Sequence, residues 1–127
     1  MKHILIVDDN GPIGEIMSDI LEMEGYQTTV RMTGIDAMIF IENLHPDLIL
    51  LDVMLDGGID GRDICKAIKQ STGWVKNLPV IMVSATHNLK DTTLNFCEPN
   101  DFISKPFDIY HLVETVNKQL GNDNRAA

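Results

Sequence analysis

The stretch Asp47-Leu48-Ile49-Leu50-Leu51-Asp52 decides how the rest of the chain can be arranged. Residues 48–51 are all apolar, and a run of this length suits a strand buried on both faces but is too short for a buried helix. In open parallel sheets the functional crevice lies beyond the carboxyl ends of the strands. Asp52 stands at that end, so it is a candidate for chemistry, with the start of a simple turn as the alternative.

Strand-like and helix-like segments alternate on both sides of this run. Further strands are predicted at residues 4–7, 26–32, 80–83 and 102–103. Helices are predicted from Pro12 to about 24, from a Thr33 cap to about 44, and over 62–70, 90–96 and 108–120. Such alternation indicates an α/β domain with helices on both faces of a parallel sheet. We therefore predict a flavodoxin-like doubly wound sheet of five strands in the order 2-1-3-4-5, with five helices.

Composition limits the possible partners. The chain has 127 residues and a net charge of −9, which suits one domain over residues 1–121, with 122–127 as a flexible tail or the start of a linker. Its few basic residues form no stripe, so we expect no direct binding to nucleic acid or to an anionic membrane. No run approaches the ~20 apolar residues of a membrane span. Cys65 and Cys97 lack metal-ligand spacing and are expected to be buried free thiols in a reducing cytoplasm.

Polar residues follow the predicted strands at one edge of the sheet. Asp8 and Asp9 follow the first strand, Asp52 ends the third, Ser84 ends the fourth and Lys105 follows the fifth. Because all five positions are at carboxyl ends of parallel strands, we expect their side chains to converge. This convergence, more than any single residue, predicts a functional site.

The residue types predict the chemistry of that site. Two carboxylates ~4 Å apart repel by about 4 kcal/mol at an effective dielectric of about 20, so a cation, a lysine or a proton must offset the repulsion. Oxygen ligands of this kind suit Mg²⁺. A carboxylate beside that ion can attack phosphorus and form an aspartyl phosphate. Lys105 and Ser84 would surround the transferred group with an ammonium and a hydroxyl.

At this point the chain resembles the receiver domains of two-component response regulators, in the form of the chemotaxis regulators. The resemblance covers nearly the whole chain. Its marks are, in order, Ile4-Leu5-Ile6-Val7-Asp8-Asp9-Asn10, Leu50-Leu51-Asp52-Val53-Met54-Leu55, Asp60-Gly61, Val83-Ser84-Ala85 and Phe102-Ile103-Ser104-Lys105-Pro106-Phe107.

The resemblance implies a role for each acidic residue. Asp52 would be the phosphoacceptor, taking the group from a sensor histidine kinase or a histidine phosphotransfer protein. Asp9 would bind Mg²⁺ directly, Asp8 mostly through water, and Met54 through its backbone carbonyl. The domain would catalyse only its own phosphorylation and dephosphorylation, and so would not be an enzyme in the usual sense.

The resemblance also implies a switch. Lys105 would pair first with Asp52 and then with the phosphoryl group, and the Lys105–Pro106 peptide would be cis. Ser84 would move toward the group and Phe102 would follow, turning inward. The surface of helix four, strand five and helix five would then change for a downstream protein or a covalently linked output domain.

Two departures from the family pattern stand out. Asp56 occupies a position that is usually proline, and Gly57-Gly58 lengthens the loop by one residue. We hypothesise that the extra carboxylate weakens metal binding or changes the dephosphorylation rate, with a solvated loop acid as the alternative. Residues 97–101 replace the usual Ala-Gly-Ala-Asp-Asp, so we expect a shortened or loosened fourth helix.

Two other functions remain open from the residues alone. A haloacid-dehalogenase-type phosphohydrolase also uses an aspartate nucleophile, but it needs an acid two residues later, where this chain has Met54. A flavodoxin-like cofactor binder would need a hydroxyl- and glycine-rich loop after the first strand. Incubation with Mg²⁺ and acetyl phosphate distinguishes the three.

Overall fold

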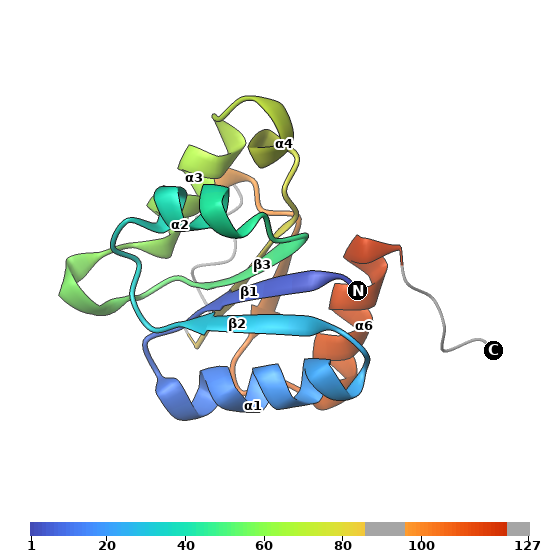
Figure 1. Cartoon of the computed structure of the whole chain (residues 1–127). Helices are drawn as coiled ribbons and strands as arrows, with labels where there is room; N and C mark the ends of the chain where they lie inside the picture. Colours follow the sequence, from blue (N-terminus) through green and yellow to red (C-terminus); the bar gives the residue numbers. More distant parts are fainter. Residues whose placement is uncertain (86–95, 122–127) are drawn as a thin grey trace.

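The computed structural model describes residues 1–85 and 96–121. Its sheet holds β1 (His3–Val7), β2 (Gln27–Arg31), β3 (Leu48–Asp52), β4 (Val80–Ser84) and β5 (Asp101–Ser104). All neighbouring strands are parallel, in the order β2-β1-β3-β4-β5 (Figure 1). The predicted topology and the position of Asp52 as the last residue of β3 are thus confirmed.

The three central strands are apolar because both of their faces are covered. Every residue of β3 and β4 is buried. Side chains on one face, such as Ile49 and Leu51, belong to a core shared with α2 and α3, whereas Leu48 and Leu50 belong to a second core under α1 and α6. A sheet buried on both faces fixes where each strand ends, and therefore where the residues after it lie.

Five α-helices form two layers around the sheet in the described part of the chain (Figure 1). On one side lie α1 (Gly11–Met23) and α6 (Ile109–Leu120), and on the other lie α2 (Ala37–Leu44), α3 (Gly61–Lys69) and the short α4 (Gly73–Lys76). A one-turn 3₁₀ helix, η1 (Asp56–Gly58), follows β3. Asn10, Asp60 and Asp108 cap the first turns of α1, α3 and α6 with their side chains.

Some helix predictions differ from the structure in detail. α2 begins at Ala37, because Thr33 accepts a hydrogen bond from the Ile35 backbone instead of capping a helix. The apolar side chains of Ile16 in α1 and Ile109 in α6 are 51% and 58% exposed, so not every apolar residue of the predicted helices faces the core. The helix predicted at 90–96 and the tail predicted at 122–127 fall almost wholly outside the described residues. The short α4, which carries Trp74, was not predicted.

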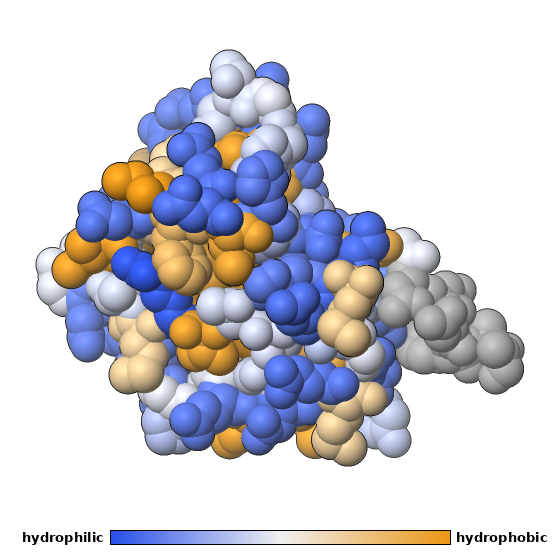
Figure 2. Space-filling view, in the orientation of Figure 1, coloured by the Kyte–Doolittle hydropathy of each residue, from blue (hydrophilic) through white to orange (hydrophobic). Residues whose placement is uncertain are grey.

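None of the helices in residues 1–85 and 96–121 has the length and apolar character needed to cross a bilayer. Figure 2 shows a face on which hydrophilic and hydrophobic side chains are interspersed. Large exposed apolar residues beside or within α2 include Met32, Ile35 and Ile39.

Candidate functional site

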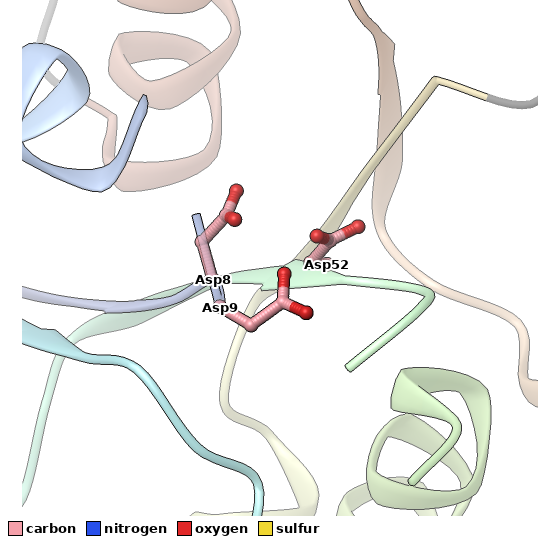
Figure 3. A group of neighbouring side chains, drawn as sticks. All are labelled: Asp8, Asp9 and Asp52. Atoms are coloured by element: carbon pink, nitrogen blue, oxygen red, sulfur yellow. The ribbon is translucent and has the colours of Figure 1, made fainter. Parts of the chain in front are cut away.

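Three carboxylates meet where β1 and β3 end. Asp8 and Asp9 follow β1 directly, and Asp52 is the last residue of β3, whose register places Val7 beside Leu51. One oxygen from each carboxylate lies within 4.8 Å of the others (Figure 3). The predicted convergence of residues separated by more than forty positions is therefore present in the fold.

Lys105, which follows the edge strand β5, also reaches this cluster. Its Nζ donates to Asp8 Oδ2 at 2.8 Å and to Asp52 Oδ2 at 3.3 Å. Its backbone N–H donates to the Ser84 carbonyl at 2.8 Å, which continues the β4–β5 ladder past the end of β5. The Lys105–Pro106 peptide is cis, as predicted. One ammonium thus bridges the two most buried acids of the cluster.

Burial and neighbouring charges both shift the pKa values of Asp52 and Lys105. Burial raises the pKa of Asp52, the positive charge of Lys105 lowers it and the negative charge of Asp8 raises it again, with a net rise. Burial lowers the pKa of Lys105, but its bonds to Asp8 and Asp52 outweigh that effect and raise it overall. A further positive charge near the Asp52 carboxylate would therefore stabilise its ionised form.

The two proposed switch residues lie on the neighbouring strands. Ser84 ends β4 and is buried, and it faces the same edge of the sheet as Asp52. Phe102 on β5 is 8% exposed and packs in the core shared with α2 and α3. The aromatic ring is thus already inward in this structure, which describes one of the two states that the switch prediction requires.

Gly61 holds α3 against the end of β3, and this close contact explains the glycine of the sequence motif Asp60-Gly61. A Cβ at this position would lie 1.9 Å from the Asp52 backbone oxygen, and the Gly61 N–H donates to the Val53 carbonyl at 2.6 Å. Only glycine allows this approach. Asp60 caps the helix beside it and pairs with Arg62 at 2.6 Å.

The loop after Asp52 returns beside the site through a narrow turn. Met54 pairs with Asp60 in an isolated antiparallel bridge, and between them η1 carries Asp56 and two glycines with positive φ. Burial is the first cause of a raised Asp9 pKa, and the proximity of the Asp56 carboxylate is the second. The unusual Asp56 therefore lies close enough to Asp9 to raise the pKa of that residue, although the Asp56 side chain itself is exposed.

The donor set fits a hard divalent cation. The carboxylates of Asp8, Asp9 and Asp52 offer only oxygen atoms, close enough together to share one ion. Mg²⁺ takes such ligands and keeps several waters, which suits a site with one half-exposed member, Asp9. The Met54 carbonyl, predicted as a further ligand, belongs to the loop that begins directly after this cluster.

Comparison with known proteins identifies the same architecture. The family model for the response regulator receiver domain matches residues 4–117. A curated relative, the DNA-binding response regulator MtrA of Mycobacterium tuberculosis, is 34% identical over 128 residues, which cover 99% of this chain and 54% of that protein. The chain spans about half the length of the curated relatives it matches.

Solved structures agree over nearly the whole chain. The signal receiver domain of a signal transduction histidine kinase from Syntrophus aciditrophicus is 32% identical, covers 98% of this chain and 94% of that one, and has a TM-score of 0.86. The response regulator TrrA of Thermotoga maritima, solved in complex with Mg²⁺ and BeF, is 28% identical with a TM-score of 0.83, over 94% of this chain and 100% of that one. The family match over residues 4–117 includes the strand ends that carry the site.

Proposed function

This chain belongs to the response regulator receiver domain family, and from that premise we propose that it accepts a phosphoryl group on Asp52 in two-component signalling. The donor would be the phosphohistidine of a sensor kinase or of a phosphotransfer protein. The observation that carries the proposal is the position of Lys105 Nζ, 2.8 Å from Asp8 and 3.3 Å from Asp52.

We propose a task for each side chain of the cluster. An Asp52 carboxylate oxygen forms the new bond to phosphorus while the bond from phosphorus to the donor nitrogen breaks. Asp8 and Asp9, with Asp52 and the Met54 carbonyl, would hold Mg²⁺, which would supply positive charge for the phosphoryl oxygens. Lys105 would keep its bond to Asp8 and turn its other contact from the Asp52 oxygen to a phosphoryl oxygen.

The consequence of phosphorylation would pass to β5 through two short links. The Ser84 hydroxyl would donate to the added group, and the backbone bond between Ser84 and Lys105 already couples β4 to the segment after β5. Phe102 lies in that strand, in contact with the core. We propose that the face formed by β5 and α6 is part of the output surface; the predicted fourth helix, also expected there, lies almost wholly outside the described residues.

The proposal also covers partners and setting. The relatives named as DNA-binding response regulators are about twice as long as this chain, so we propose a DNA-binding output, linked covalently or contacted as a separate protein. The acidic receiver itself would not touch nucleic acid. It would work in the cytoplasm and catalyse only its own phosphorylation and dephosphorylation.

Intact-mass measurement after incubation with acetyl phosphate and Mg²⁺ tests the function. We expect one phosphoryl group per chain, none in Asp52→Asn or with EDTA, and normal incorporation in Asp56→Asn, which removes a nearby acid but keeps the nucleophile. Continuous release of phosphate, many turnovers per chain, would point to a phosphohydrolase instead. Incorporation that survives in Asp52→Asn would overturn the assignment.

A further inference from the structure

Two cysteines that lie 32 positions apart in the sequence meet on the α2–α3 side of the sheet, away from the acidic cluster. Cys65 is in α3, and Cys97 lies before β5. The Cys65 Sγ donates to the Cys97 carbonyl at 3.5 Å, and the two thiols also hydrogen-bond each other. Both are reduced and buried, 0% and 3% exposed. Neither has a part in the proposed phosphorylation.

The two sulfurs differ in access and in charge. Cys97 lines a cavity of about 260 Å³ together with Lys66, Lys69 and Phe96, whereas Cys65 is fully buried and does not line it. The hydrogen bond from Cys65, and then the charges of Arg62 and Lys69, lower the pKa of Cys97 despite its burial. The same hydrogen bond and burial raise the pKa of Cys65. A thiol that lines a cavity and has a lowered pKa, beside one that does not line it, is the arrangement of a reactive and a resolving cysteine.

From this geometry we infer that Cys65 and Cys97 form a reversible redox site that reacts with a hydroperoxide and closes to an intramolecular disulfide. In the first step the Cys97 thiolate attacks one peroxide oxygen and the O–O bond breaks. Cys97 becomes a sulfenic acid, and the leaving oxygen takes up the thiol proton as an alcohol, or as water when the oxidant is hydrogen peroxide. The peroxide is reduced and the sulfur is oxidised.

In the second step the Cys65 sulfur attacks the Cys97 sulfur. The S–S bond forms and the S–O bond breaks, and the leaving hydroxide takes the Cys65 proton and departs as water. Disulfides in a reducing compartment are typically transient and redox-sensing, which fits a pair that is reduced at rest. The bond ties α3, which begins beside Asp52, to the segment that leads into β5.

Peptide mapping of the whole chain after treatment with hydrogen peroxide tests this inference. Under non-reducing conditions we expect one cross-linked peptide that joins Cys65 to Cys97 within a monomer. Both thiols should disappear together, and dithiothreitol should restore both. Cross-links between chains, or irreversible oxidation of Cys97 with no Cys65–Cys97 peptide, would overturn the inference.

Two variants separate the roles of the sulfurs. In Cys65→Ala the sulfenic acid of Cys97 should persist and be captured by dimedone. In Cys97→Ala the Cys65 thiol should oxidise at least about tenfold more slowly than in the wild type. Cys65 does not line the cavity, and its raised pKa keeps the thiol protonated. Equal oxidation of Cys65 in both backgrounds contradicts the order of reaction. Circular dichroism tests whether each variant folds. If a variant does not fold, the peptide map of the oxidised wild-type chain tests the inference by itself.

Discussion

The buried cluster of Asp8, Asp52 and Lys105 and the exposed turn η1 after β3 lie side by side but are built in opposite ways. The cluster lies at the ends of strands, every residue of β3 is buried, and each member of the cluster has a charged partner. The turn holds two glycines with positive φ and an exposed acid. Reactive groups that need fixed positions thus stand on buried strands, whereas the adjacent turn is free to vary in length and charge.

The largest expected effect comes from removing the ammonium of the buried cluster. Lys105→Met leaves Asp8 and Asp52 without their shared cation, and removal of one partner from a buried ion pair costs about 3 kcal/mol. Urea unfolding in EDTA measures the loss. Mg²⁺ should return part of the stability, because it supplies the missing positive charge.

Lys118→Met is the control for Lys105→Met, since the exposed Lys118 is in the last turn of α6 and forms no such cluster. Its unfolding free energy should stay within about 0.5 kcal/mol of the wild type. Equal losses in the two variants would mean that the ammonium of Lys105 has no special relation to the acids.

A pair of glycine substitutions sharpens the contrast between the cluster and the turn. Gly61→Ala places a Cβ 1.9 Å from the Asp52 backbone oxygen, and the required backbone shift should lower stability by roughly 3 kcal/mol and slow phosphorylation. Gly58→Ala meets no atom within 4 Å and should cost only about 1 kcal/mol, through its positive φ. Thermal unfolding ranks the two, and the reverse order would contradict the close packing seen here.

The contrast also explains what the sequence could predict. Continuous apolar runs identified β1, β3 and β4, and parallel topology then placed Asp8, Asp9, Asp52 and Lys105 at one edge. These inferences rest on burial, which leaves a strong mark on composition. The family resemblance supplied the cis peptide at Lys105, which no local pattern specifies.

Other features depend on contacts between distant segments and leave no such mark. Nothing in the spacing of Cys65 and Cys97 shows that α3 and the segment before β5 bring them together. The late start of α2 follows from Thr33 bonding to Ile35, a local competition that a capping rule alone does not resolve. The contact between Asp56 and Asp9 likewise appears only once the turn is folded.

The ion pair between Asp60 and Arg62, which follows the turn, should have a smaller and pH-dependent effect on stability. Arg62 lowers the pKa of Asp60 below its ordinary 3.8 through a side-chain hydrogen bond. A carboxylate with a lowered pKa stabilises the fold above its ordinary pKa, and that stability is lost as the pH falls through the folded value. Arg62→Met should therefore lose about 1 kcal/mol at neutral pH, discounted for partial exposure, and the difference from wild type should close in acid. A difference that is constant with pH would assign the effect to packing alone.

The smallest effect concerns the turn itself. The Asp56 carboxylate lies near Asp9, so it places a further negative charge beside a ligand that the cluster would offer Mg²⁺. Asp56→Pro with deletion of Gly58 should change Mg²⁺ affinity or the dephosphorylation rate by a few-fold, because an exposed charged pair is worth at most about 1 kcal/mol. Asp56→Asn keeps the loop length and isolates the charge. If both variants bind Mg²⁺ and lose phosphate as the wild type does, the turn has no influence on the buried cluster. If only the shortened loop has an effect, backbone freedom and not the extra acid couples the two regions.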